Sequence, residues 1–271
     1  LEGSKLFAKK FMQKYNIPTA DFKSFNSSSI LEAKKYLAQI RPPFVIKADG
    51  LAAGKGVFIC HELNHAKKII DEIIVNGKFG SSGNNIVIEH FLDGPELSVF
   101  ILTNGKHYKL LPSAKDYKRI GENDTGLNTG GMGAISPVPF LDDVLMKKIK
   151  EKIIEPTLRG LKKEKIEYSG FIFLGLIKVG DEPFVIEYNV RLGDPETQVI
   201  MPRIKSDLLD LFLKMPIDEI FEQSSLDISS QMASSIIVAS KGYPEEYATG
   251  FRVKGIEKVQ NCAVFHAKGF K

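Results

Sequence analysis

The segment at 185–191, which reads VIEYNVR, places the tightest constraint on how this chain can fold. Its alternation of polar and apolar residues predicts a β-strand, because a strand sends every second side chain to the same face. One face then carries Glu187, Asn189 and Arg191 in a row. The opposite face is expected in the core and carries Ile186, Tyr188 and Val190.

The polar row suits phosphate chemistry. A carboxylate beside an amide oxygen is a pair of hard ligands for Mg²⁺, and a guanidinium two residues further on can bind a phosphate or a carboxylate. A solvated strand face with a surface ion pair is the alternative. We favour a binding site because the strand runs into the tight, polar segment 193–196 and then a helix, where α/β proteins hold ligands.

Bulk properties exclude several classes of function. The chain has 271 residues, 43% hydrophobic and 26% charged, which is typical of a globular protein with more than one domain or lobe. The net charge of +4 is spread over many lysines, which suits small anions and does not indicate a nucleic-acid partner. No apolar run is long enough to cross a membrane. Cys60 and Cys262 are expected as free thiols, which favours the cytoplasm.

Hydrophobic periodicity predicts a mixture of helices and strands. Helices are expected at 4–12, 29–40, 62–75, 141–163 (bent near Pro156), 195–213 and 217–223. Strands are expected at 44–48, 57–60 and 85–91, with hairpins at 96–111 and 171–190, and with 232–239 and 263–266 in a small third unit. Asn104-Gly105 is a typical hairpin turn. Asp194 is expected to cap the helix that begins at Pro195, and Pro202 to kink it.

A glycine-rich stretch, IKADGLAAGKGV at 46–57, follows an expected strand. Glycines let backbone N–H groups approach phosphate oxygens closely, and Lys47 and Lys55 add positive charge. The stretch is not a P-loop, because Gly56 stands where that motif needs the metal-binding Ser or Thr. A glycine hairpin with exposed lysines is the alternative; we favour a phosphate-binding lid.

Two further segments carry candidate binding groups. The strand at 86–91 ends in polar residues, and the backbone of such a segment can hold adenine while Glu96 accepts hydrogen bonds from a ribose. A purely structural strand and turn is the alternative. The stretch 113–133 holds five glycines and few large apolar residues. Loops of that length without structure are usually functional or disordered, and we favour a substrate loop that presents N–H groups to an anion.

Taken together, these segments resemble the ATP-grasp superfamily, and within it the glycinamide ribonucleotide synthetase (phosphoribosylamine–glycine ligase) family. The matching stretches run in family order over nearly the whole chain: LEGSK at 1–5, IKADGLAAGKGV at 46–57, VIEHFLDGPELSVF at 87–100, DTGLNTGGMGAISP at 124–137, EYNVRLGDPETQ at 187–198, VASKGYPEEY at 238–247 and VFHA at 264–267. The runs at 124–137 and 187–198 are the most specific.

The resemblance implies an α+β fold: an ATP-grasp, with two α+β lobes that hold ATP between antiparallel sheets, plus part of a small C-terminal β-rich domain. The implied boundaries are a linker helix at 1–19, a small lobe or lid at 20–91, a large lobe with the metal and substrate site at 92–223, and a partial C-terminal domain at 224–271. Family members begin with a further N-terminal lobe, so we expect the chain to be a fragment that lacks this lobe and the end of the C-terminal domain.

The resemblance also implies individual site residues. ATP would be bound by Lys47, Lys55, Gly54, Gly56, Glu89, Phe91, Leu92 and Glu96, the last at the ribose. Mg²⁺ or Mn²⁺ would be bound by Glu187 and Asn189, with phosphates and water completing the shell. The catalytic residues would be Arg191, Lys47, Asp116 and Lys118. The substrates would bind at Asp124, Thr125, Asn128, Thr129, Gly130, Gly131, Met132, Gly133, Arg191, Asp194, Pro195 and Glu196.

The implied reaction is that of a carbon–nitrogen ligase forming ADP in purine biosynthesis. ATP would convert glycine into glycyl phosphate, and the amine of 5-phosphoribosylamine would then displace phosphate. Phosphoryl transfer needs positioning and charge neutralisation rather than a covalent nucleophile, and no nucleophile is evident. The expected partners are these small-molecule substrates in the cytoplasm, with no nucleic acid and no membrane, and with a dimer left open.

Two other functions stay open at this point. The first is another ATP-grasp ligase, such as a carboxylase component or a peptide ligase, against which the run at 124–133 argues. The second is a non-catalytic nucleotide-binding module, which would bind ATP without forming ADP in a glycine-dependent manner.

Overall fold

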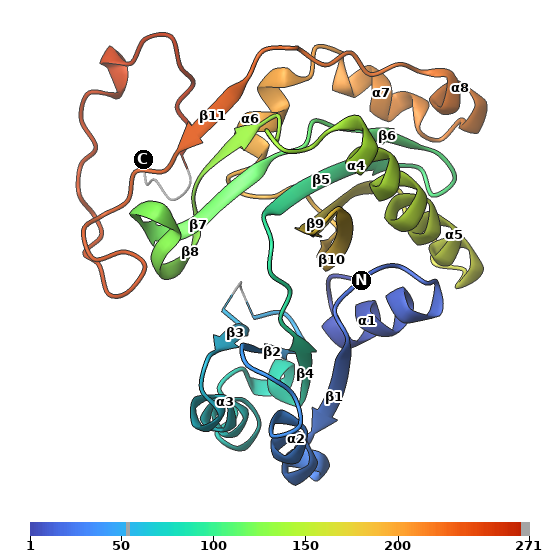
Figure 1. Ribbon diagram of the computed structural model, residues 1–271. Coiled ribbons are helices and arrows are strands. Elements are labelled where there is room, and N and C mark those ends of the chain that lie inside the picture. Colours follow the sequence, from blue (N-terminus) through green and yellow to red (C-terminus); the bar gives the residue numbers. More distant parts are fainter. Residues whose placement is uncertain (53–54, 267–271) are drawn as a thin grey trace.

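The computed structural model describes residues 1–52 and 55–266 (Figure 1). In that part of the chain the strands form three antiparallel sheets, two with four strands and one with three. The combination of helices with antiparallel sheets is the expected α+β class. None of the helices in these ranges is both long enough and apolar enough to cross a membrane.

The smaller lobe, blue to cyan at the bottom of Figure 1, is built on a sheet of order β1-β4-β2-β3. Its strands are β1 (Phe22–Asn26), β2 (Phe44–Ala48), β3 (Val57–Cys60) and β4 (Asn85–His90). One face packs on the helices α2 (Ile30–Leu37) and α3 (Leu63–Ile70), the latter continued by a π-helical turn (Asp71–Val75). Because side chains alternate along a strand, Ile46 and Ile88 enter this core, while their neighbours Lys47 and Glu89 lie on the other face.

The larger lobe is built on a sheet of order β10-β9-β5-β6. Its strands are β5 (Glu96–Thr103), β6 (Tyr108–Leu110), β9 (Gly170–Val179) and β10 (Glu182–Asn189). The continuous apolar run of β5 is buried on both faces: Val99 and Ile101 enter one core, and Phe100 and Leu102 enter another. Both expected hairpins, around Asn104-Gly105 and around 180–181, are confirmed.

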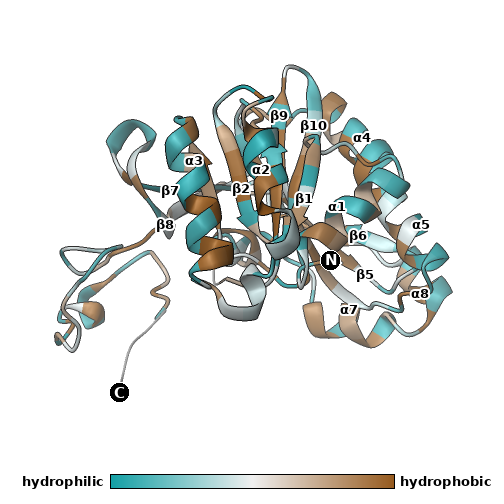
Figure 2. Cartoon of the chain, turned by 90° about the horizontal axis from the view of Figure 1, so that it is seen from below, coloured by the Kyte–Doolittle hydropathy of each residue, from teal (hydrophilic) through white to brown (hydrophobic). Residues whose placement is uncertain are grey.

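Helices cover both faces of the larger sheet. One face packs on α1 (Lys5–Lys14), α4 (Asp143–Ile149) and α5 (Glu155–Lys163), and the other on α6 (Thr197–Ile200), α7 (Leu208–Lys214) and α8 (Asp218–Gln223). A π-helical turn (Lys150–Ile154) joins α4 to α5 just before Pro156, where the bend was expected. Gly160 lets α5 approach α1, because a Cβ atom there would lie 2.5 Å from Phe11 Cζ. Figure 2 shows apolar residues along the strands and polar residues on the outward turns of the helices.

The stretch 113–133 is not the structureless loop that its composition predicted. It forms most of a hairpin between β7 (Lys115–Gly121) and β8 (Thr125–Ser136), joined by a 3-10 turn (Glu122–Asp124). The strand β11 (Ala233–Ile236) then pairs with β8, so it belongs to this sheet and not to a separate third unit. Of the β8 glycines, Gly133 is paired on both sides, with Tyr117 of β7 and Ile236 of β11, and this pairing supplies order that a glycine side chain cannot. The strand expected at 263–266 is wrong, since these residues have no ladder partner.

The helix expected over 195–213 is broken. Helix α6 begins only at Thr197 and ends in a 3-10 turn (Met201–Arg203) at Pro202, which has no N–H to continue the helix. Helix α7 then starts afresh, because the Asp207 side chain accepts hydrogen bonds from its first N–H groups. Asp194 does not cap α6; its carboxylate accepts a hydrogen bond from Gln198 Nε2 at 2.7 Å.

A bulge alters the faces of β10. Val185 and Glu187 pair with successive residues of β9, which leaves Ile186 as an extra, unpaired residue. The alternation expected through the strand is therefore interrupted. Of the three residues expected in the core, only Tyr188 is buried; Ile186 is half-buried, and Val190, beyond the strand end, is 42% exposed. Val185 takes the buried place instead.

Candidate active site

The two lobes meet at the bulge of β10. Lys47, on the small-lobe strand β2, donates a hydrogen bond from Nζ to the carbonyl oxygen of Ile186 at 3.2 Å. Because Ile186 is the unpaired residue of the bulge, its carbonyl can accept a donor from outside the sheet. A cation of the small lobe therefore lies against the large-lobe strand that carries Glu187 and Asn189.

Two lysines and one glutamate form a buried charged triad at this junction. Glu89 Oε2 lies 3.0 Å from Lys9 Nζ, and Glu89 Oε1 lies 3.0 Å from Lys47 Nζ. Each of the three side chains is at most 5% exposed. Although Oε1 is within ion-pair distance of Lys47, it accepts no hydrogen bond from any residue in the described ranges. Glu89 Oε1 therefore has Lys47 as its ion-pair partner and can still accept a hydrogen bond from a ligand.

Lys5 is a candidate that sequence reasoning missed. Its N–H donates to the carbonyl oxygen of Asp49 at 3.0 Å, and its Nζ donates to that of Gly50 at 3.1 Å, so the start of α1 is fixed to the end of β2. Burial lowers the pKa of Lys5, and the charge of Lys47 lowers it further, against a smaller effect from Glu187. Lys5 is thus a second cation beside Lys47. The sequence did carry a signal for Lys5: the stretch LEGSK at 1–5 matches the family, but the resemblance assigned no role to its residues.

Glu187 and Asn189 lie side by side, as their spacing predicted. Asn189 Nδ2 is 3.4 Å from Glu187 Oε1, so both side chains point to one region. Gly175, the partner of Glu187 on β9, makes this possible, because a Cβ atom there would lie 2.8 Å from Glu187 Cγ. Within 1–52 and 55–266 no group of three or more His, Cys, Asp or Glu side chains could hold a metal. A carboxylate and an amide oxygen fit Mg²⁺ or Mn²⁺ only with oxygens from substrate and water, as expected.

Arg191 does not extend the row of Glu187 and Asn189. The strand ends at Asn189, and Arg191 turns to the N-terminal segment, where its Nε lies 3.3 Å from Glu2 Oε1. The other carboxylate oxygen of Glu2 accepts a hydrogen bond from the N–H of Val190 at 2.9 Å. Glu2 therefore holds both the backbone and the side chain at the end of β10.

A second charged cluster, made of residues from β5, from β7 and from the segment just before α6, lies near β10. Lys118 Nζ lies 3.0 Å from Glu96 Oε2 and 3.5 Å from Asp116 Oδ2. Glu196 is buried, and its Oε1 accepts a hydrogen bond from Ser98 Oγ at 3.0 Å. The charge of Glu187 on β10 also acts on Lys118. Residues predicted as catalytic or binding on β5, on β7, on β10 and just before α6 therefore lie near one another.

The pKa values in this second cluster are displaced in the directions expected for crowded carboxylates around one cation. Burial lowers the pKa of Lys118, but the charges of Glu96, Asp116 and Glu187 outweigh it, and the pKa is raised. Burial raises the pKa of Asp116; Lys118 opposes this and Glu96 adds to it. Burial raises the pKa of Glu196, and the charge of Asp116 raises it further. Lys118 is therefore a firmly protonated cation beside two carboxyl groups that resist ionisation.

The β7–β8 hairpin divides the predicted substrate residues into two groups. Gly131 is packed so closely on Pro195 that a Cβ atom at 131 would collide with the proline ring. Gly130 N–H donates to the Tyr243 hydroxyl at 3.1 Å. The carbonyl oxygen of Met132 accepts a hydrogen bond from the N–H of Ile237, just after β11, at 2.9 Å. The far end of the hairpin, with Asp124, Thr125 and Asn128, is exposed. In the described ranges no side-chain hydrogen bond or ion pair joins these three residues to the rest of the predicted site.

The residues predicted for the lid tip, and two of those predicted for adenine, lie on connections between strands. Lys55 is exposed and its N–H donates to Ala52 O at 2.8 Å, whereas Gly56 is buried. Gly54 lies outside the described residues. Phe91 is 37% exposed and Leu92 is half-buried, and both lie on the connection from β4 to β5.

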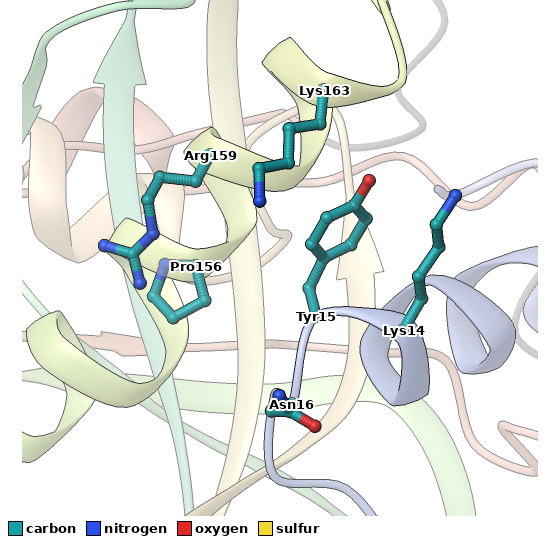
Figure 3. Close-up of a pocket in the computed structure, with 6 residues that line it drawn as sticks. All are labelled: Lys14, Tyr15, Asn16, Pro156, Arg159 and Lys163. Atoms are coloured by element: carbon teal, nitrogen blue, oxygen red, sulfur yellow. The ribbon is translucent and has the colours of Figure 1, made fainter.

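A separate pocket of about 350 Å³ lies between the end of α1 and α5 (Figure 3). Its lining residues are Lys14, Tyr15, Asn16, Pro156, Arg159 and Lys163. None of them belongs to the predicted site. Its three cations are exposed, and two of them are paired with neighbouring carboxylates, Lys14 with Glu164 and Arg159 with Glu155. We therefore place the candidate active site at the lobe junction and not in this pocket.

Comparison with known proteins decides the family. The family model for the phosphoribosylglycinamide synthetase ATP-grasp (A) domain matches residues 3–197, from the start of α1 to the start of α6. The chain belongs to this ATP-grasp family. This match confirms the ATP-grasp fold and the resemblance that the motifs indicated, and it contains the triad, Glu187 and Asn189.

Individual members of this ATP-grasp family agree. The chain is 43% identical to the phosphoribosylamine–glycine ligase of Caldanaerobacter subterraneus subsp. tengcongensis over 98% of its own length and 63% of the relative. It is 46% identical to the chloroplastic enzyme of that name from Arabidopsis thaliana, over 98% of the chain and 51% of the relative. The crystal structure of the Thermotoga maritima phosphoribosylamine–glycine ligase gives a TM-score of 0.82 at 37% identity, covering 91% of this chain and 61% of that one. The chain thus spans less than two thirds of these relatives.

Proposed function

We propose that this chain supports the ATP-dependent ligation of glycine to 5-phosphoribosylamine, which gives glycinamide ribonucleotide, ADP and phosphate. A carboxylate oxygen of glycine attacks the γ-phosphorus of ATP, ADP leaves, and glycyl phosphate forms. The amine of phosphoribosylamine then attacks the acyl carbon, the acyl–oxygen bond breaks as phosphate leaves, and the amine loses a proton. The names of the 43–46% identical relatives support this choice of substrates.

In this proposal ATP binds between the small lobe (20–91) and the large lobe (92–223). The side chains of Lys5, Lys47 and Lys55 bind the phosphates, with Gly54 and Gly56 allowing close approach of the backbone. Adenine is held by Glu89 and by the connection at 91–92, and Glu96 accepts hydrogen bonds from the ribose. The acceptor that Glu89 leaves free supports its role, because the exocyclic amine of adenine is a donor.

The large lobe supplies the remaining chemistry. Glu187 and Asn189 hold Mg²⁺ or Mn²⁺, which, when bound, neutralises phosphate charge. Lys118 supplies fixed positive charge for the phosphoryl group in transfer, and Asp116 keeps Lys118 in place. Arg191 adds its charge by leaving its ion pair with Glu2. Residues 124–133 and 194–196 bind glycine and phosphoribosylamine. The contact of Gly131 with Pro195 supports treating these two segments as one surface.

One observation carries the proposal. Lys47 of the small lobe reaches the bulge of β10 at Ile186, one residue before Glu187. A phosphate-binding cation and a pair of metal-binding oxygens are therefore neighbours in a chain of this ATP-grasp family. Phosphoryl transfer requires that combination.

The test is an ADP-release assay with glycine and freshly generated phosphoribosylamine. Glu187→Ala is expected to lose activity by about 10²-fold or more, as the loss of an electrostatic group in a site usually does. Glu182→Ala is the matched control, because Glu182 is on the same strand but pairs with Lys148 and Lys152 at the other end. Equal turnover by both variants would refute the metal assignment. ATP binding by the wild type without glycine-dependent ADP formation would favour a nucleotide-binding module, and ADP formation with other acids in place of glycine another ATP-grasp ligase.

A further inference from the structure

Lys9 is a buried cation whose hydrogen bonds are all satisfied. Only 2% of it is exposed, and its Nζ reaches Thr19 Oγ1 at 2.7 Å, Ala20 O at 3.2 Å and Glu89 Oε2 at 3.0 Å. Burying an ammonium group is costly, and apolar residues often replace buried ion pairs without loss of stability. A structural role alone therefore does not account for a lysine at this position.

The contacts of Lys9 are part of a chain of hydrogen bonds and ion pairs that starts at one carbonyl of β10 and returns to the next one. The hydroxyl of Thr19, which accepts from Lys9, donates to Val185 O at 2.7 Å. At the other end, Lys47 donates to Ile186 O. The carboxylate of Glu89 joins the two lysines. Two neighbouring carbonyls on the metal strand are thus tied to one buried carboxylate of the small lobe.

The triad carries a net charge of +1 that depends on Lys9. With both lysines present, the Glu89 carboxylate is shared, and Lys47 keeps positive charge for a ligand. Without Lys9, Glu89 and Lys47 would neutralise each other in a buried site, where the attraction between opposite charges is strong. Glu89 would then be held by Lys47 alone, so Oε1, which already lies 3.0 Å from Lys47 Nζ, would no longer be fixed in place for a nucleotide.

We propose that Lys9 is a positioning residue for ATP: it holds one oxygen of Glu89 so that the other oxygen, together with the charge of Lys47, is available to the nucleotide. The inference rests on the proposed function, since it presumes that ATP binds at the lobe junction. Lys9 itself touches no substrate. Burial lowers its pKa to about 8, so it is mostly protonated at neutral pH.

The test is a double-mutant cycle of Lys9→Met and Glu89→Gln, in which the affinity of the full chain for MgATP is measured by calorimetry at pH 7. Lys9→Met is expected to weaken binding by about tenfold, within the range usual for coupled sites. In the Glu89→Gln background the same change is expected to cost less than about threefold, because the carboxylate that Lys9 restrains is already neutral. Lys10→Met, the exposed neighbour on α1, is the matched control and is expected to bind as the wild type does.

Three outcomes would overturn the inference. Equal tenfold losses in both backgrounds would show that Lys9 acts independently of Glu89. Unchanged affinity in Lys9→Met, even with a lowered melting temperature, would show a structural role only. If Lys9→Met does not fold, Lys9→Arg keeps the charge, and a tenfold loss of affinity in a natively folded Lys9→Arg would contradict positioning by charge. A wild type that binds no MgATP would instead refute the proposed function, and the inference with it.

Discussion

Gly175→Ala tests whether the proposed metal site at Glu187 and Asn189 depends on the space that Gly175 leaves on the neighbouring strand β9. A Cβ atom at 175 would lie 2.8 Å from Glu187 Cγ, and ordinary contact begins at 3.4 Å, so Cγ must move by about 0.6 Å. Metal–oxygen distances tolerate only about 0.2 Å. The backbone of Gly175 is not left-handed, so alanine adds little strain of its own. We expect metal affinity to fall by about 10- to 100-fold, the range seen when groups that orient metal ligands are altered.

The assay is a titration of Mn²⁺ in the presence of ATP, followed by the metal's magnetic resonance signal. Thermal unfolding is measured in parallel, to separate a displaced ligand from a damaged sheet. Gly3→Ala is the control, because a Cβ atom there meets nothing within 4 Å. Unchanged Mn²⁺ affinity in a folded Gly175→Ala would refute the assignment of Glu187 as a metal ligand.

Three further predictions concern stability. Gly160→Ala is expected to reduce the free energy of unfolding by about 1–3 kcal/mol in urea titrations, because its methyl group overpacks against Phe11; no loss would mean that α1 and α5 adjust freely. Arg203→Met is expected to cost about 2–4 kcal/mol in the same titrations, since its guanidinium donates to three acceptors in the interior, and a loss no larger than that of the exposed Arg159→Met would contradict this. Between pH 8 and 10.5 the unfolded chain binds more protons at Lys9 than the folded one, so the free energy of unfolding contributed by this group rises with pH. Lys9→Met should lose that part of the slope relative to Lys10→Met, because the charged groups around Lys9, which are Glu89, Lys47 and Asp21, are the same in both variants.

Features set by local chemistry could be predicted from the sequence. Asn104-Gly105 makes a tight turn with little help from the rest of the fold, and the two residues at 187 and 189 share a face because a strand alternates. The pairing of Glu187 with Asn189 was therefore foreseeable. The family motifs added the fold, which local patterns alone did not specify.

Features set by distant partners could not be predicted. The bulge at Ile186 depends on the register with β9, and the turn of Arg191 depends on Glu2, which is 189 residues earlier. Lys9 reads as one lysine among several on an amphipathic helix. It is buried only because the small-lobe sheet, formed by later residues, closes over it. The pairing of Gly133 likewise depends on β11, about a hundred residues further along.

The packing of α1 has a consequence for synthesis on the ribosome. Its apolar residues Phe11 and Met12 lie in the same core as Tyr188, so their final partners are made about 175 residues later. The small lobe, whose strands lie between Phe22 and His90, can form its own core in the meantime. At a synthesis rate of 5–20 residues per second, the last of these partners follows the first helix by roughly 10–35 s. Until then this side of the helix is exposed apolar surface, the kind of surface that chaperones protect from aggregation, and the small lobe folds beside an unpaired helix.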